Sequence, residues 1–439
     1  MKRRNVRPLG LWMATALVVG NMIGSGTYLL PASLAPYGAA SLLGWSVSLV
    51  GALLLAFTFA RLGRLLPLTG GPYAYARNAF GKFAGFITAW CYWVSIWCGN
   101  AAIAVAFAGS LGGVFPAVTA TPLRGALCAL SAVWLCTLFN VLGARTAGWV
   151  QLVTAVLKLL PLFLIVIVGA FWLEPAGFTP VNPSGAPLLD ITTATVALTL
   201  WAFLGMESAT VPAENLRDPE RTIPRATIIG TLLAGLATLF ACMTVLGLVP
   251  AEQLAASNAP FATAAGVLWG NTAGLVFAAA ATIACFGALN GWILMQGQIP
   301  LAAARDGLFP HGFARQDARG TPVFALVFSS VVTTLLVIAN YQVSLVELFT
   351  WSILLSTAAV LVPYLVSMAA AIRMEHGKRN GVAMTVFVLA FVYSLWALIG
   401  TGIEALSWGA GLIVAGLPVY FLLPNFKRNS ASGRDGARA

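Results

Sequence analysis

Long apolar runs separated by short polar segments extend along almost the whole chain. A bilayer core takes about 20 apolar residues per helix, and counting runs of that length predicts about twelve spans. The predicted spans lie near 10–36, 41–65, 84–113, 124–142, 148–173, 190–212, 226–249, 273–303, 322–340, 345–372, 382–401 and 406–424. The pattern therefore predicts an all-α polytopic membrane protein.

The composition favours one transmembrane unit. Of the 439 residues, 59% are hydrophobic and 8% are charged, whereas soluble domains carry roughly 25% charged residues. Because the apolar content is uniform, we expect a single transmembrane domain over 1–424 and a polar tail over 425–439. The six cysteines lie inside apolar runs, without the spacing of a disulfide framework or a metal site. We therefore expect neither a metal nor a cofactor.

The basic residues test the number of spans independently. All but two of the 24 Lys and Arg residues lie in the N-terminal segment or follow an even-numbered span; the exceptions are Arg124 and Lys158. Lys and Arg collect in cytoplasmic loops. The sequence therefore predicts an inner-membrane protein with both termini in the cytoplasm. This topology explains the net charge of +11, which gives no reason to expect a nucleic-acid partner.

Glycine interrupts two of the predicted spans at corresponding places. The first span contains GNMIGSG at 20–26, and the sixth contains TLWAFLGMESATVP at 199–212. Secondary transporters with inverted repeats have discontinuous helices at the substrate site, and paired interruptions of this kind are the best pointer to it in a sequence. The pattern therefore predicts a 5+5 inverted repeat. The two repeats lie at about 10–173 and 190–372, followed by two extra helices at about 382–424.

The interruptions also predict what the site binds. Unwound backbone is tolerated in a membrane only where a cavity or a ligand receives its polar groups. The amide groups of Ile23, Gly24, Ser25 and Gly26 suit a carboxylate, since the N-terminus of the second half-helix carries partial positive charge. Carbonyls at the other helix ends, including that before Gly205, suit an ammonium. An α-amino acid carries both groups. The alternative is that these glycines only allow close helix packing.

At this point the chain resembles a known family, the amino acid–polyamine–organocation transporters, and within it the basic amino acid/polyamine exchangers. The likeness covers nearly the whole chain, and its motifs are GNMIGSGTYLLP, TGGPYAYARNAFG, LWAFLGMESATVPAENLRDPERTIPRAT and GWILMQGQIPLAAARDGLFP. The resemblance implies a LeuT-like arrangement of ten core helices in two inverted repeats with two extra helices. It also implies a possible homodimer.

Candidate site residues follow from residue type and from this resemblance. Glu207 is the one carboxylate well inside a predicted span, and acids in a membrane are functional by default; the resemblance implies a role in transport or its coupling. The resemblance also implies that Trp201 gates the site from outside and that Trp292 stacks on the cationic end of the substrate. Ser95, Asn100 and Ser356 are candidates for the side-chain end of the pocket. The alternative for these residues is a structural role in helix packing.

Lys158 departs from the pattern of the exchangers, which carry an apolar residue at that place. Proton-coupled members of the wider superfamily often have a lysine there, which acts in place of a bound sodium ion. Lys158 could load and unload a proton together with Glu207, or it could remain charged against carbonyls of the first span. A charge near the site disfavours a cationic substrate unless Glu207 offsets it. The aromatic residues and Lys158 therefore point to different substrates.

The sequence thus predicts a secondary active transporter of amino acids or their amines, working by alternating access. An exchanger of cationic amino acids and polyamines is favoured, and the alternative is a proton-coupled amino acid symporter that uses Lys158. No Ser–His pair lies within the spans and no phosphate-binding loop is present, so we do not expect an enzyme. A sensor is disfavoured because no signalling domain is seen. A channel is disfavoured because the spans carry no rings of polar residues.

Overall fold

The computed structural model describes residues 10–68, 70–211, 213, 216–376 and 380–423, so the predicted tail lies outside the described residues. Within these ranges the chain is helical and contains no strand. The α-helices are α1 (Leu11–Met22), α2 (Ser25–Tyr28), α3 (Leu30–Leu34), α4 (Ser41–Leu65), α5 (Pro72–Phe80), α6 (Lys82–Val114), α7 (Pro122–Val141), α8 (Ala144–Gly169), α9 (Leu188–Leu200), α10 (Pro219–Leu248), α11 (Ala251–Ala255), α12 (Pro260–Trp269), α13 (Asn271–Arg305), α14 (Val323–Ala339), α15 (Leu345–Glu375), α16 (Gly381–Gly400) and α17 (Gly402–Leu422). Short 3-10 turns that matter below are η1 (Ala35–Ala40), η5 (Trp201–Phe203) and η6 (Met206–Thr210).

The helices confirm a polytopic membrane protein. Nine helices among the described residues are long and apolar enough to cross a bilayer. The other three predicted spans correspond to shorter apolar helices, namely α1 with its continuation, the second half of α8, and α14. The number twelve stays a prediction. The sequence pattern missed α11 and α12, which form in the loop expected at 250–271, between the predicted spans 226–249 and 273–303. Helix α12 has ten residues, which is about 15 Å of helix. This length is half the thickness of a bilayer core.

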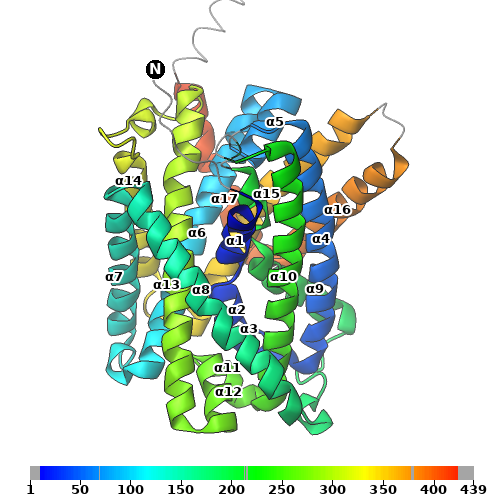
Figure 1. Ribbon diagram of the computed structural model, residues 1–439, viewed down its shortest axis with the longest axis vertical. Helices are drawn as coiled ribbons and strands as arrows, with labels where there is room; N and C mark the ends of the chain where they lie inside the picture. Colours follow the sequence, from blue (N-terminus) through cyan, green and yellow to red (C-terminus); the bar gives the residue numbers. More distant parts are fainter. Residues whose placement is uncertain (1–9, 69, 212, 214–215, 377–379, 424–439) are drawn as a thin grey trace, which may run out of the picture.

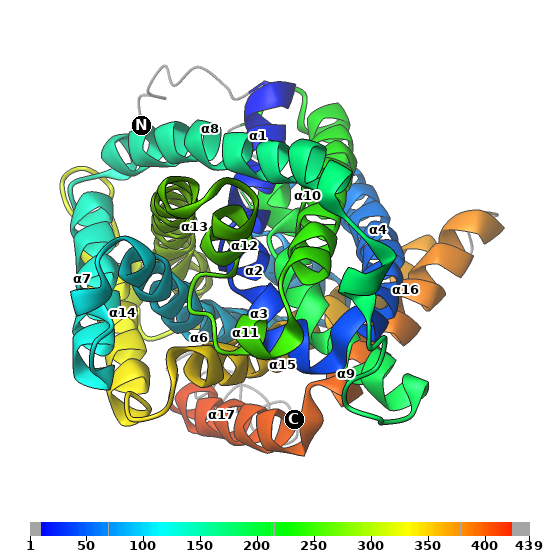
Figure 2. The ribbon, with the colours of Figure 1, turned by 90° about the horizontal axis from the view of Figure 1, so that it is seen from below.

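The helices form a bundle around the interrupted first span. Most helices run along the long axis of the molecule in Figure 1, and α8 crosses them obliquely. Seen along that axis in Figure 2, α2 and α3 lie near the centre, between α6, α13, α10 and α15. Helix α6 packs along both α13 and α15 and is buried over almost its whole length. In contrast, α16 and α17 lie at the edge of the bundle and expose most of their apolar side chains.

Both predicted interruptions are present. Helix α1 ends at Met22, and Ile23 and Gly24 are extended before α2 begins at Ser25. Helix α9 passes into η5, and the chain then turns at Leu204 and Gly205 before η6 begins. Gly205 has φ 101°, a left-handed conformation that is costly for a residue with a side chain. The backbone at these points is therefore not continuous helix.

Candidate functional site

The two interruptions face each other in the middle of the bundle. A Cβ atom on Gly205 would lie 3.0 Å from the Asn21 side chain, so the two interrupted segments are in direct contact there. The Asn21 side-chain amide also donates a hydrogen bond to the Ser208 hydroxyl over 2.8 Å. This bond joins the end of α1 to η6, the segment that follows the second interruption. The geometry brings together two segments separated by about 180 positions in the sequence.

Glycine is needed in the first interruption because neighbouring atoms leave no room for a side chain. A Cβ on Gly24 would lie 2.6 Å from that of Ala288, and one on Gly26 would lie 2.9 Å from the Ala202 backbone. Real Cβ atoms do not approach other atoms so closely. Close packing and a broken helix therefore occur at the same residues, and packing alone does not explain the segment.

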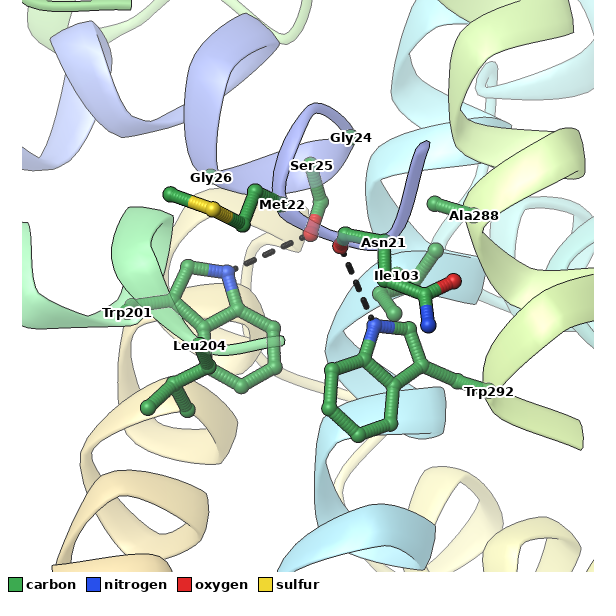
Figure 3. Close-up of a pocket in the computed structure, with 10 residues that line it drawn as sticks. All are labelled: Asn21, Met22, Gly24, Ser25, Gly26, Ile103, Trp201, Leu204, Ala288 and Trp292. Carbon is green, nitrogen blue, oxygen red and sulfur yellow. Dashed lines mark hydrogen bonds between the residues drawn. The ribbon is translucent and has the colours of Figure 1, made fainter. Parts of the chain in front are cut away.

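A small cavity lies directly against the first interruption (Figure 3). Trp201 and Trp292 form two of its walls, and their indole nitrogens point toward the α1–α2 connection. Trp201 donates to the Ser25 hydroxyl over 3.3 Å, and Trp292 donates to the Asn21 carbonyl over 3.3 Å. The remaining lining comes from the backbone of the interruption and from apolar side chains, which are Met22, Gly24, Gly26, Ile103, Leu204 and Ala288.

This cavity is too small for an amino acid. Its volume is about 10 Å³, room for about one water molecule. A substrate therefore needs at least one lining group to move. The indoles of Trp201 and Trp292 are the largest lining groups, and each is held to the interruption by one hydrogen bond at the long end of the usual range.

A second cavity lies on the far side of the two indoles. It shares Trp201, Trp292, Ile103 and Leu204 with the first cavity and is likewise about 10 Å³ in volume. Its other lining residues are Ser95, Ile96, Gly99, Ser356 and Val360. The two cavities thus share both indoles, and the interrupted backbone lines the first while mainly apolar residues line the second.

The two serines of the second cavity are held by the backbone. The Ser356 hydroxyl donates to the Ser95 carbonyl over 2.6 Å, and the Ser95 hydroxyl donates to the Tyr92 carbonyl over 2.7 Å. A hydroxyl has one donor hydrogen and two acceptor lone pairs. Both hydroxyls have therefore used their donors and can act toward a ligand only as acceptors. This arrangement favours a donor group, such as an ammonium, at this end.

Glu207 lies beside the cavities rather than in their lining. Its carboxylate is fully buried and accepts hydrogen bonds from the Tyr92 hydroxyl at 2.5 Å and from the Tyr364 hydroxyl at 2.7 Å. It also accepts one from the Gly205 amide at 3.2 Å. Helices α6 and α15 are thereby joined to η6 through one acid. Any movement of these three segments relative to each other must break or rearrange these bonds.

Lys158 belongs to α8, and its side chain lies against the end of α1. Its side chain is fully buried, and its ammonium donates to the carbonyl of Gly20 and, over 2.7 Å, to that of Ile23. The Tyr28 hydroxyl in turn donates to the Lys158 carbonyl over 2.8 Å. Lys158 thus supplies donors to carbonyls that lost their helical partners when α1 was interrupted. Its contact with carbonyls of the first span is one of the two arrangements expected from the sequence.

Of the residues expected at the site, most lie around the two cavities. Ser25, Gly24, Gly26, Trp201, Trp292, Ser95 and Ser356 line them, while Ile23, Gly205, Glu207 and Lys158 support the interrupted backbone beside them. Asn100 is the exception. Its amide donates to the Gln296 side chain over 2.7 Å, and it lines neither cavity. The structure therefore does not bring Asn100 to the side-chain end of the pocket, and a role there stays an untested prediction.

The sequence reasoning missed Tyr92 and Tyr364, the partners of Glu207. A signal was available, since each tyrosine lies within a long apolar run and a buried hydroxyl needs a hydrogen-bond partner. It also missed Asn21, which links the two interruptions. Among the described residues, no group of three or more His, Cys, Asp and Glu side chains gathers in a way that could hold a metal ion.

Comparisons with known proteins agree with this geometry. A family model described as amino acid permease matches residues 9–423. A cadaverine/lysine antiporter of Escherichia coli strain K12 is 35% identical over 406 residues, which is 90% of each chain. The putrescine transporter PotE of the same strain is 31% identical over 440 residues, covering 99% of this chain and 100% of the relative. The PotE of Haemophilus influenzae is 32% identical over 418 residues, covering 94% and 96%.

Proposed function

This chain belongs to the amino acid permease family, and on that premise we propose that it exchanges a cationic amino acid for a polyamine-type substrate by alternating access. The chain is an integral inner-membrane transporter and not an enzyme. The observation that carries the proposal is the pair of interruptions at Gly24 and Gly205, which meet beside cavities walled by two indoles. The names of the relatives, an antiporter of cadaverine and lysine and two putrescine transporters, support substrates of this class.

The first cavity receives the head of an amino acid. The amides of Ser25 and Gly26 lie in the first turn of α2, where a helix has no internal acceptors for its N–H groups. These amides suit the substrate carboxylate. The carbonyls of α1 are less available for the α-ammonium, because Lys158 donates to two of them and Trp292 to a third. Entry of the substrate therefore requires the Trp292 bond to Asn21 to open.

The second cavity receives the cationic end of the side chain. It offers two hydroxyl acceptors, from Ser95 and Ser356, and is also lined by the indoles of Trp201 and Trp292. An ammonium has three donors and a guanidinium has five. Two acceptors and an aromatic ring satisfy most of the N–H donors of an ammonium. They leave about half of the N–H donors of a guanidinium without partners in a buried site. We therefore place lysine-, ornithine-, cadaverine- and putrescine-like substrates ahead of arginine and agmatine.

Glu207 supplies a negative charge beside the interrupted backbone at Gly205. A second buried positive charge close to Lys158 would be repelled, and a carboxylate offsets that repulsion. Glu207 also holds α6, η6 and α15 together through Tyr92, Tyr364 and Gly205. We assign to it a coupling role, in which arrival or departure of the cation changes the bonds that join these three segments.

The surroundings of Lys158 support a structural role for this side chain. Its ammonium donates to two carbonyls of the interruption, and a charged donor makes the stronger hydrogen bonds. Loss of its proton would weaken the support of the interrupted backbone. We therefore assign Lys158 to the support of the interrupted backbone, and the name of the cadaverine/lysine antiporter favours exchange over the symport alternative.

The topology and assembly belong to the same proposal. The positive-inside pattern supports both termini in the cytoplasm. The corresponding interruptions support the inverted repeats at about 10–173 and 190–372, with α16 and α17 as extra helices. The exposed apolar side chains of α17 suit a second copy of the chain, as expected for a homodimer.

Exchange is tested in proteoliposomes that contain the purified protein. Vesicles loaded with unlabelled lysine or cadaverine should take up labelled lysine, whereas empty vesicles should not, and an imposed pH gradient should change neither result. Uptake that is indifferent to internal substrate and follows the pH gradient would show symport and overturn the proposal. A thermal-shift series complements this test, since a ligand that binds only the folded protein raises its unfolding midpoint. Lysine and diamines should raise the midpoint more than arginine, and a response limited to neutral amino acids contradicts the assignment.

A further inference from the structure

A groove on the outside of the bundle combines basic and apolar residues. It has a volume of about 480 Å³ and is lined by Phe80, Ala369, Ile372, Arg373, His376 and Phe391. These residues come from the end of α5, the end of α15 and the middle of α16. Figures 1 and 2 show that the end of α15 and the start of α16 (orange) stand out from the bundle, and no residue that lines this groove also lines a substrate cavity.

Arg373 is free to bind an anion from this groove. Its guanidinium carbon lies 5.6 Å from the centre of the Phe80 ring, a cation–π contact that holds the side chain in place. The nearby Glu375 is fully buried and is paired with Arg61 at 2.6 Å. Among the described residues, no carboxylate lies within ion-pair distance of Arg373 itself. Arg373 and His376 are both exposed, so the groove presents one guanidinium charge and one imidazole, without a neutralising acid among the described residues.

The groove lies at the depth of the lipid headgroups. Helix α15 has 31 residues, or about 46 Å of helix, whereas the hydrocarbon core is about 30 Å thick. Its last turn, which carries Arg373, therefore projects into the headgroup region. In the topology proposed above this is the cytoplasmic leaflet.

The apolar walls of the groove continue into the hydrocarbon region. Ile372 and Phe391 line the groove, and along α16 the exposed side chains of Val388, Val392 and Leu395 follow at helical spacing on the same face as Phe391. An acyl chain can lie along this face while its phosphate reaches the guanidinium. A free phosphate ion would gain nothing from these apolar residues.

From these observations we infer that the groove is a binding site for an anionic phospholipid of the cytoplasmic leaflet, with the phosphate on Arg373 and an acyl chain along α16. Basic pockets between helices on the cytoplasmic side bind anionic headgroups in this way. The site adjoins the transport machinery. Helix α5 carries Arg77, which pairs with Asp306 of the segment following α13, and α15 carries Tyr364, which binds Glu207. A lipid between α5, α15 and α16 stabilises the arrangement in which these bonds form.

The site is tested by titrating phospholipids into the protein in a neutral detergent and following the unfolding midpoint. Dioleoyl phosphatidylglycerol should raise the midpoint more than dioleoyl phosphatidylethanolamine. The concentration of phosphatidylglycerol for half the effect should rise about five-fold in Arg373→Gln, as expected for one lost charge near the headgroup. Arg373→Lys should lie between this variant and the wild type, and Arg315→Gln, which removes an exposed arginine from another loop, should match the wild type. The variants without lipid should unfold at similar midpoints, which controls for folding.

Several results would overturn the inference. Equal effects of the two phospholipids, or an unchanged response in Arg373→Gln, would exclude an anionic lipid at this residue. An equal effect of inorganic phosphate alone would identify a site for a free anion. If native mass spectrometry showed that Arg373→Gln dissociates an oligomer without reducing the retained phosphatidylglycerol, the groove would be covered by a second copy of the chain. Because these readouts need no transport substrate, they succeed or fail independently of the proposed exchange activity.

Discussion

The ammonium nitrogen of Lys158 lies 2.7 Å from the carbonyl oxygen of Ile23, and it donates a second hydrogen bond to the carbonyl of Gly20. The Gly20 carbonyl belongs to the last turn of α1, and the Ile23 carbonyl lies just past its end, where the helix is interrupted. A lysine side chain on one helix thus completes the hydrogen bonding of another helix inside the membrane. The energetic consequence is large, because a buried polar group without a partner is more costly than the same group exposed to water.

Replacing Lys158 by alanine should destabilise the protein and abolish exchange. The substitution leaves two buried carbonyls without donors, at a cost of about 1–3 kcal/mol each. The unfolding midpoint in detergent should fall clearly below that of Lys82→Ala, which removes an exposed lysine at the start of α6. If Lys158→Ala kept full stability and lost only a response to pH gradients, Lys158 would be a proton carrier and the structural role would be wrong.

Trp292→Leu should weaken binding of cationic substrates. The indole donates a hydrogen bond to the Asn21 carbonyl and lines the second cavity. Loss of a cation–π contact worth about 0.5–2 kcal/mol predicts a roughly 2- to 30-fold higher Kd for lysine. Trp292→Phe keeps an aromatic face and should recover part of this affinity. Equal affinities of the leucine and phenylalanine variants would argue against stacking of the substrate on Trp292.

Gly26→Ala should prevent closure of the site. The added Cβ would lie 2.9 Å from the Ala202 backbone, which cannot move aside as a flexible side-chain end could. Overpacking of this kind costs about 1–3 kcal/mol, and the exchange rate should fall by about 5- to 150-fold as estimated from that range. Gly411→Ala is the matched control, since its Cβ would meet no atom within 4 Å. A fully active Gly26→Ala variant would show that the α1–α2 connection does not need this contact.

Glu207→Gln should separate the charge of this side chain from its hydrogen bonding. Glutamine has nearly the same shape but offers one acceptor oxygen, so only one of the Tyr92 and Tyr364 bonds is preserved without rearrangement. We expect a large loss of exchange of dicationic substrates and a smaller loss of thermal stability. Asp190→Asn, an exposed carboxylate at the start of α9, should behave as the wild type. If Glu207→Gln transported diamines normally, the negative charge would be unnecessary.

Tyr73 and Arg77 bind the same carboxylate, that of Asp306, and thereby hold α5 against the segment after α13. Burial, and then the hydrogen bond to Asp306, raise the pKa of Tyr73 above its usual value. The phenol therefore stays protonated at neutral pH. Its contribution to stability is complete below its ordinary pKa of about 10 and is lost only as the pH rises through the raised value. Tyr73→Phe should lower stability by about 1 kcal/mol, equally at pH 6 and pH 9; a difference that disappears at pH 9 would contradict this assignment.

The sequence alone determined the features that depend on neighbouring residues. Bilayer thickness sets the length of an apolar run, so the predicted spans agree closely with the helices, as 41–65 does with α4. Glycine weakens a helix wherever it occurs, so both interruptions were found at Gly24 and Gly205. The expected loop 250–271 was less well predicted, because α11 and α12 are short helices in an apolar segment that cannot span the membrane.

Only the tertiary structure decided which distant groups meet. It placed Tyr92 and Tyr364 on Glu207, joined Lys158 to the end of α1, and turned Asn100 toward Gln296 and away from the cavities. It also set the volume of the cavities, which depends on the positions of both indoles. Hydropathy and helix propensity are properties of short segments, whereas these contacts arise from the packing of helices far apart in the chain. Inside a membrane, a buried polar group binds whichever partner that packing brings within reach.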